Sequence, residues 1–201
     1  MDFRLLITLI GFSAGIIGTG LGGAVVFLWR RPGNKAVSFL LGLAGGVMLS
    51  VVLIDLLPQA IFYSNLAYTT LGVFLGLLVL RLMAGYIKTI ESDNQYIQTG
   101  ILLGIAIAMH NFPEGLAIGA GYVATAKLGL GLAVVIALHN FPEGLAMATP
   151  MNVGGWPPGK ILRATILPGI PMGIGAFCGA AISNLSPVIL ALNLGFAGGG
   201  M

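Results

Sequence analysis

The sequence predicts an all-α protein, a polytopic bundle of helices that cross a lipid bilayer. Only 7% of its 201 residues are charged and 57% are hydrophobic, whereas a soluble globular domain has about 25% charged residues. The mean hydropathy is +1.02. Six nearly uncharged apolar stretches have the length of about 20 residues that a membrane-spanning helix needs. Stretches this long exclude both a soluble domain and the alternating pattern of a membrane barrel.

Each predicted span begins and ends where charged or turn-forming residues interrupt the apolar sequence. The spans cover residues 5–29, 36–63, 67–86, 99–124, 128–148 and 161–182. A seventh stretch, 187–201, would extend only about 22 Å as a helix, less than a hydrocarbon core of about 30 Å. We therefore expect a single transmembrane domain over residues 1–201 whose seventh helix is incomplete.

Lysine and arginine collect at one end of the predicted helices. Only Arg4 and Lys127 fall at the opposite end. Because short cytoplasmic loops carry an excess of these residues, we expect a multi-pass protein of the plasma or inner membrane, with an extracellular or periplasmic amino terminus. The charges that set this orientation are Arg30, Arg31, Lys35, Arg81, Lys88, Lys160 and Arg163.

Two internal repeats organise the chain. Residues 110–117 and 139–146 both read HNFPEGLA, 29 positions apart. LGLAGGVM, which ends at Met48, resembles LGFAGGGM, which ends at Met201, 153 positions later. Since transporters often combine two repeated halves around a central site, spans one to three would correspond to spans six to eight. This predicts a 3+2+3 arrangement from which the rest of helix seven and all of helix eight are missing.

The doubled motif places ionisable side chains inside the membrane, where they are costly and indicate a functional site. In each copy the histidine and the glutamate are four residues apart, one turn along one helix face. Two such helices facing one another would gather His110, Glu114, His139 and Glu143 around a shared space. Imidazole nitrogens and carboxylate oxygens bind Zn²⁺ and its neighbours, and two carboxylates offset the charge of a dication.

Further candidate ligands lie beside these four. Asn111 and Asn140 offer neutral oxygens on a neighbouring face and would suit a second, weaker or hydrated ion. On the second span, Met48, Asp55 and Gln59 form one stripe, because they are separated by seven and four residues. Met48 supplies a soft thioether and Asp55 a hard oxygen, although core packing explains Met48 equally well.

Two other functions were weighed against metal binding. A membrane metalloprotease would carry H-E-x-x-H, with the general base beside a histidine; neither copy has that order, so we expect no enzyme. A proton-coupled carrier of a small organic solute is the alternative, since His and Glu chains also relay protons. It would need groups that recognise the solute, and the spans offer almost no arginine or aromatic cage.

The sequence resembles the ZIP (Zrt/Irt-like) family of divalent metal transporters, especially its bacterial zinc-uptake branch. The resemblance rests on HNFPEGLA in the fourth and fifth spans, LGLAGGVMLSVVLIDLLPQA in the second and SAGIIGTGLGGAVV in the first. It implies a ZIP-type inverted repeat, an extracellular amino terminus and movement of metal into the cytoplasm.

The resemblance also implies a binuclear metal centre in which the two glutamates bridge. Many relatives carry a glutamate in the sixth helix, in a Glu-Pro-x-Gly-Ala context, where IPMGIGA places Met172 here. We therefore treat Met172, with Asp55 and Gln59, as a candidate pathway residue. The candidate metal ligands are His110, Asn111, Glu114, His139, Asn140, Glu143 and Met48.

We accordingly expect transport of a divalent transition metal, with zinc as the first candidate. Fe²⁺, Mn²⁺, Co²⁺ and Cd²⁺ also suit these ligands, since the affinity order alone does not choose among them. The expected partners are these ions and the lipid bilayer, without a cofactor or nucleic acid. Helix faces rich in small residues permit a homodimer.

Overall fold

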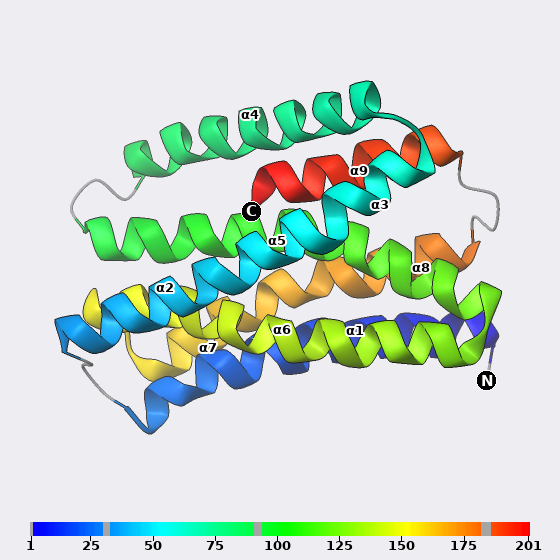
Figure 1. The fold of residues 1–201 in the computed structure, drawn as a ribbon. Helices are drawn as coiled ribbons and strands as arrows, with labels where there is room; N and C mark the ends of the chain where they lie inside the picture. The colour runs from blue at the N-terminus through cyan, green and yellow to red at the C-terminus, as the bar shows by residue number, and fades with distance from the viewer. Residues whose placement is uncertain (1, 30–32, 91–93, 182–185) are drawn as a thin grey trace.

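The computed structural model describes residues 2–29, 33–90, 94–181 and 186–201, apart from the side chains of residues 34, 55, 88 and 90. Within these ranges every secondary-structure element is a helix. The helices run back and forth between two ends of one bundle (Figure 1). This confirms the prediction of an all-α polytopic bundle.

The long helices carry short irregular segments at three points. A 3₁₀ turn follows the first helix, a π-helical stretch joins α2 to α3, and a second 3₁₀ turn joins α7 to α8. In chain order the elements are α1 (Phe3–Ala24), η1 (Val25–Phe27), α2 (Asn34–Ser50), η2 (Val51–Leu56), α3 (Leu57–Tyr63), α4 (Leu66–Ile90), α5 (Gln95–Ala124), α6 (Ala126–Val153), α7 (Pro158–Ile166), η3 (Leu167–Gly169), α8 (Ile170–Ala181) and α9 (Pro187–Gly200).

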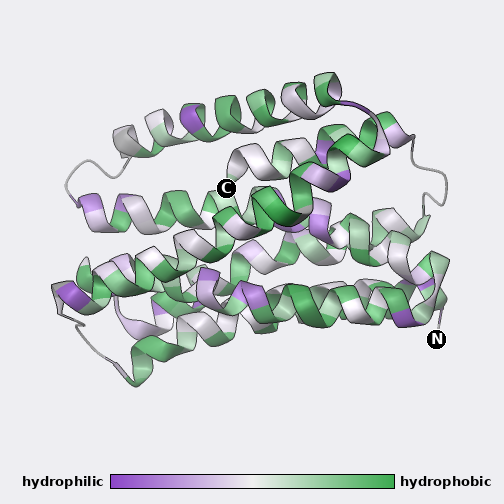
Figure 2. Ribbon diagram, in the orientation of Figure 1, coloured by the Kyte–Doolittle hydropathy of each residue, from purple (hydrophilic) through white to green (hydrophobic). Residues whose placement is uncertain are grey.

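Among the described residues, six helical stretches are long and apolar enough to cross a bilayer. Large apolar side chains cover their outer surface, and Leu28 and Phe62 are 90% and 86% exposed. Figure 2 shows hydrophobic colouring along the length of the helices. Such a surface suits a lipid solvent, in which helices pair their own backbone groups. The stretches are Phe3–Phe27, Lys35–Tyr63, Leu66–Ile87, Gln95–Ala124, Ala126–Val153 and Pro158–Ala181, and the shorter α9 is also apolar.

Polar side chains define the helix ends, as expected where the first backbone N–H groups need an acceptor. Asn94 accepts hydrogen bonds from the amides of Tyr96 and Ile97 at the start of α5, and its own amide donates to Gly154 O at 3.0 Å. Thr125 ends α5 and caps α6, accepting from Leu128 N at 3.1 Å. These caps hold α5 and α6 as an antiparallel pair.

Two of these helices are longer than the sequence predicts. α5 begins at Gln95 rather than at residue 99, because the Asn94 cap sets its start. α6 continues through Pro150 to Val153, and Gly154 N donates to Pro150 O at 2.8 Å to close its end. The expected end of the sixth span at residue 182 lies outside the described residues.

Four helices form a closed ring at the centre of the bundle: α1 packs on α6, α6 on α5, α5 on α8 and α8 on α1. Glycines allow backbones to approach closely in this ring. A methyl group added at Gly144 of α6 would collide with the carbonyl of Thr19 in α1, and one added at Gly115 of α5 would collide with the carbonyl of Met172 in α8.

A second layer covers the ring. α9 packs between α4 and α5 and also contacts α3, while α2 packs on α6. α4 and α9 meet closely as well, since a methyl at Gly76 would collide with Phe196 O and one at Gly199 with Val73 O. In Figure 1, α4 lies at the outer edge and α9 between it and α5. This layer leaves the midpoints of α5 and α6, which carry the doubled motif, inside the protein.

Candidate metal site

The doubled motif lies midway along α5 and α6, and each helix continues through its proline, Pro113 or Pro142. Proline removes one intrahelical hydrogen bond, and such irregular backbone is tolerated in a membrane where it is buried in protein. The interior location follows from the ring, because α5 and α6 pack on one another and on α8 and α1.

The histidine of each motif pairs with the glutamate of the other. His110 Nε2 lies 3.1 Å from Glu143 Oε2, and His139 Nε2 lies 3.0 Å from Glu114 Oε1. The two helices therefore face one another with their His–Glu faces, as the spacing of four residues predicted.

These pairs are buried unequally. His110 is fully buried and Glu143 is 1% exposed, whereas the His139 side chain is 14% exposed and that of Glu114 4%. His110 and Glu114 lie one turn apart on α5 and His139 and Glu143 one turn apart on α6, so the two cross-helix pairs bring all four groups into one neighbourhood. Even so, no three His, Cys, Asp or Glu side chains among the described residues form a ready metal cluster. The four expected ligands form two cross-helix pairs rather than a preformed cage.

The two asparagines lie beside the pairs and have different partners. Asn111 Nδ2 donates to the carbonyl of Pro168 at 2.6 Å. Asn140 Nδ2 donates to Met172 Sδ at 3.9 Å, a weaker contact with a soft acceptor. Both asparagines are fully buried.

Several buried acceptors at this centre have no hydrogen-bond partner among the described residues. Buried polar groups are paired in most structures, and each exception calls for an explanation such as an ion. The two glutamates and two asparagines each contribute one such oxygen. The atoms are Glu114 Oε2, Glu143 Oε1, Asn111 Oδ1, Asn140 Oδ1 and the Nδ1 nitrogen of His110.

The candidate residues of the second span lie in different surroundings in the structure. Met48 is buried, and it shares an apolar cluster with Ile107 and Met147, each about one turn from a motif residue. Asp55 falls within the π-helical stretch Val51–Leu56, but its side chain is outside the described residues. Gln59 is exposed on α3. The structure thus brings Met48 near the motif and leaves Gln59 on the surface.

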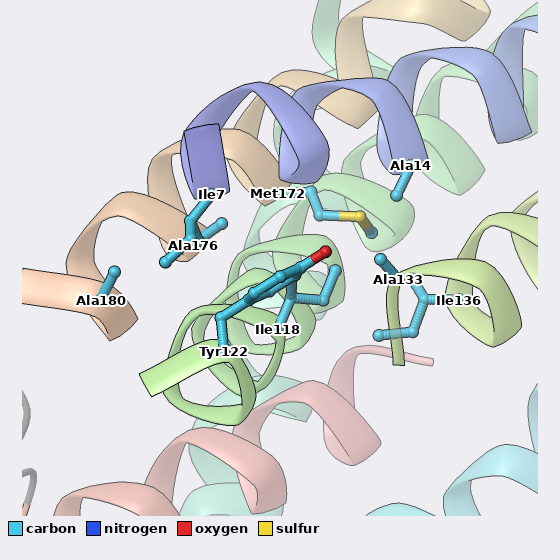
Figure 3. Close-up of a cluster of buried hydrophobic side chains, with 9 residues drawn as sticks. All are labelled: Ile7, Ala14, Ile118, Tyr122, Ala133, Ile136, Met172, Ala176 and Ala180. Atoms are coloured by element: carbon cyan, nitrogen blue, oxygen red, sulfur yellow. The ribbon is translucent and has the colours of Figure 1, made fainter. Parts of the chain in front are cut away.

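Met172 is fully buried where α1, α5, α6 and α8 converge (Figure 3). Sequence reasoning missed two residues that meet the motifs: Pro168 of η3, whose carbonyl accepts from Asn111, and Thr19 of α1, whose carbonyl lies against Gly144. A usable signal was present: the offset of 153 that relates Met48 to Met201 also relates Thr19 to Met172 and Gly22 to Gly175. These pairs are equivalent in space, since methyls at Gly22 and Gly175 would collide with the Phe carbonyls of the two motifs.

Comparison with known proteins gives the family of this chain. A family model described as ZIP Zinc transporter matches residues 85–201. A protein of Akkermansia muciniphila named zinc transporter ZupT is 33% identical over 95% of this chain and 81% of its own length. Proteins of the same name from Salmonella newport and Escherichia fergusonii are 31% and 32% identical over 65% of this chain. The matched region spans only 54% of those two relatives.

Proposed function

Since this chain belongs to the ZIP family of zinc transporters, we propose that it carries Zn²⁺ across the membrane through the His–Glu pairs between α5 and α6. The family consists of transporters rather than enzymes, and Zn²⁺ is the transported ion rather than a cofactor. Relatives named zinc transporters do not favour the carrier of an organic solute.

The observation that carries this proposal is the crossed pairing of the two motifs. Each pair joins a nitrogen and an oxygen that lie 3.0–3.1 Å apart. Two ligands bound at 2.0–2.1 Å on a tetrahedral Zn²⁺ ion lie about 3.3 Å apart. Zn²⁺ can therefore replace the hydrogen bond within a pair after a shift of a few tenths of an ångström. His110, Glu143, His139 and Glu114 would form the primary site in this way.

The unpaired oxygens support a second ion position. Asn111 Oδ1 and Asn140 Oδ1 are buried with no hydrogen-bond partner in the described part of the chain, and the same holds for the second oxygen of each glutamate. A cation would satisfy these acceptors, and neutral amide oxygens favour a weakly held or partly hydrated ion. Met172 would offer sulfur to this position, which makes it a site for softer ions.

The candidate residues of the second span contribute to the primary site and to the ion pathway. Met48, in an apolar cluster near the motif, would add a thioether to the primary site. Asp55 and Gln59, on the same helix toward its far end, would supply oxygen ligands for ions in transit. The π-helical stretch at Asp55 supports this role, because π-bulges occur frequently at functional sites.

The proposed orientation in the membrane rests on which end of the bundle carries the lysine and arginine side chains. α7, which carries the exposed Lys160 and Arg163, begins at the end of the bundle where α1 and α4 end (Figure 1), and α6 begins at the opposite end with the exposed Lys127. With the positive end in the cytoplasm, the amino terminus is extracellular or periplasmic. Movement of zinc into the cytoplasm is the direction that the family resemblance implies. Cysteines introduced by Gly159→Cys and Lys127→Cys in a Cys178→Ser background should react with impermeant reagents from opposite sides; reaction of Lys127→Cys from the cytoplasm would reverse the orientation.

The shared offset of 153 supports the 3+2+3 arrangement. It relates α1 to the α7–α8 segment and α2 to α9, while α5 and α6 exchange by the offset of 29. If the two offsets describe one symmetry, the α1–α6 contact corresponds to the α8–α5 contact, and both contacts are extensive. The metal pairs then lie on the axis that relates the two halves.

Zinc uptake by the full-length protein in proteoliposomes tests the proposal. Glu143→Gln keeps the shape of the side chain but removes its charge, so we expect zinc-dependent dye signals inside the vesicles to fall to background. Asp2→Asn, which removes a carboxylate at the cap of α1, serves as the matched control and should retain uptake. Unchanged uptake by the Glu143→Gln protein would refute the proposed site.

A further inference from the structure

A cavity of about 330 Å³ lies between α5, α6 and α7, apart from the His–Glu pairs. It forms because the sixth span breaks at η3, so that α7 diverges from α5 while α8 stays packed on it. Its walls are almost entirely apolar, which makes it unsuitable for ions or for a column of water. The lining residues include Gly104, Ala108, Met151, Ala164 and Leu167.

The cavity is open on one side, and Leu167 at its wall is 61% exposed. Its lining belongs to the stretches that can cross a membrane, so its open side meets the bilayer rather than water. From Lys160 to Pro168 the helix axis rises about 12 Å at 1.5 Å per residue, a depth suited to a flexible hydrocarbon chain. The inner end is Pro168, whose carbonyl accepts from Asn111.

A cation lies beside one wall residue of this cavity. The ammonium of Lys160 lies 3.7 Å above the ring of Trp156, which itself lines the cavity. Lys160 is one turn before Ala164 on the same face of α7, so it lies at the end of the cavity that Trp156 lines. Arg163 is exposed one turn further along, and its Nε donates to Gly159 O at 3.2 Å. Tryptophan beside basic residues is typical of a membrane–water interface.

We propose that this cavity binds one anionic phospholipid, with an acyl chain between α5 and α7 and the phosphate at Lys160. The charge of Lys160 favours an anionic lipid, because basic pockets between membrane helices bind anionic head groups. A zwitterionic head group is attracted less strongly to the Lys160 ammonium. The apolar wall provides the remaining contact area. The site is separate from the zinc pairs and does not depend on the proposed transport.

Trp156 provides the reporter for a direct test. The chain has two tryptophans, so Trp29→Phe leaves Trp156 as the single fluorophore in the full-length protein. This protein is placed in phosphatidylcholine nanodiscs that contain a small fraction of lipid brominated on its acyl chains. Bromine quenches a tryptophan only at contact. We expect brominated phosphatidylglycerol to quench Trp156 several-fold more than the same fraction of brominated phosphatidylcholine.

Three further variants complete the test. Lys160→Gln should reduce phosphatidylglycerol quenching to the phosphatidylcholine level, whereas Lys127→Gln, at the other end of the bundle, should leave the excess intact. Ala164→Phe, which fills the cavity, should lower quenching by both lipids, with thermal unfolding showing that it is folded. Equal quenching by the two lipids, or an excess that survives Lys160→Gln, would overturn the proposal, whatever the result of zinc uptake.

Discussion

The two copies of HNFPEGLA have the same sequence, yet their surroundings differ. In both, the glycine meets a backbone carbonyl and the histidine pairs with the glutamate of the other copy. On α5, however, the asparagine binds the carbonyl of Pro168, while on α6 it contacts the sulfur of Met172. The difference arises from the neighbouring helices. η3 leaves the Pro168 carbonyl available, whereas the equivalent carbonyl in α1, that of Gly15, accepts from Thr19 Oγ1 at 2.8 Å.

Local sequence therefore sets the geometry of the pairs, and the packing of neighbouring helices makes their burial unequal. A site built from two equal copies would hold its ions symmetrically. Here the α5 histidine is sealed from solvent, and the α6 histidine is partly accessible. An ion bound as proposed would meet one more accessible pair and one more enclosed pair.

The largest expected effect tests this inequality. His110→Ala leaves Glu143 buried without its partner, and breaking a buried pair in this way lowers the free energy of unfolding by about 3–5 kcal/mol. His139→Ala should cost clearly less, because the protein encloses that pair less completely. Thermal unfolding in detergent without metal provides the measurement.

The double variant His110→Ala/Glu143→Ala supplies the control, since it removes both charges and should recover part of the loss. Equal destabilisation by His110→Ala and His139→Ala would show that the two pairs are energetically equivalent, which would contradict the proposed inequality.

The glycines should behave alike in the two copies. Gly115→Ala and Gly144→Ala each force a methyl group against a backbone carbonyl, and overpacking of this kind costs about 1–3 kcal/mol. Gly131→Ala on α6 is the matched control: it has open space around it and should be neutral or slightly stabilising. Melting temperatures of the three variants measure the difference. A stable Gly144→Ala protein would contradict the close contact of α1 and α6.

The asparagines should differ by a smaller amount. Asn111→Ala removes the donor to the buried Pro168 carbonyl, which costs about 1–3 kcal/mol. Asn140→Ala loses only a long contact to sulfur, so its effect should lie below that range. Chemical unfolding of both variants separates the two values. A larger loss of stability for Asn140→Ala would contradict the claim that Asn111 makes the stronger hydrogen bond.

The smallest effect concerns ion preference rather than stability. Met172→Glu adds a hard oxygen ligand beside Asn140, so the ratio of Mn²⁺ to Cd²⁺ affinity should rise several-fold. Met172→Leu keeps the volume but removes the sulfur, and it should weaken Cd²⁺ without improving Mn²⁺. Isothermal titration with each ion measures both ratios. If Met172→Leu leaves Cd²⁺ binding unchanged, the sulfur does not contribute to the site.

Much of this fold and half of this site were readable in the sequence. Apolar stretches predicted the helices because lipid leaves a chain few other ways to pair its backbone, and the four-residue spacing predicted that His110 and His139 would each face a glutamate. The partners of the asparagines were not predictable, because they depend on where α1 and η3 cross the motif helices. Thr19 and Pro168 have no motif of their own, and only the crossing of backbones at Gly15 and Gly169 brings them to the centre.

The central claim is that Zn²⁺ replaces the hydrogen bonds of the crossed pairs. Anomalous diffraction at the zinc edge from zinc-soaked crystals of the full-length protein tests it most directly. The account predicts a peak between α5 and α6 within about 2.0–2.2 Å of imidazole nitrogen and carboxylate oxygen from both motifs. Zinc bound elsewhere, with the His110–Glu143 and His139–Glu114 hydrogen bonds intact, would contradict it.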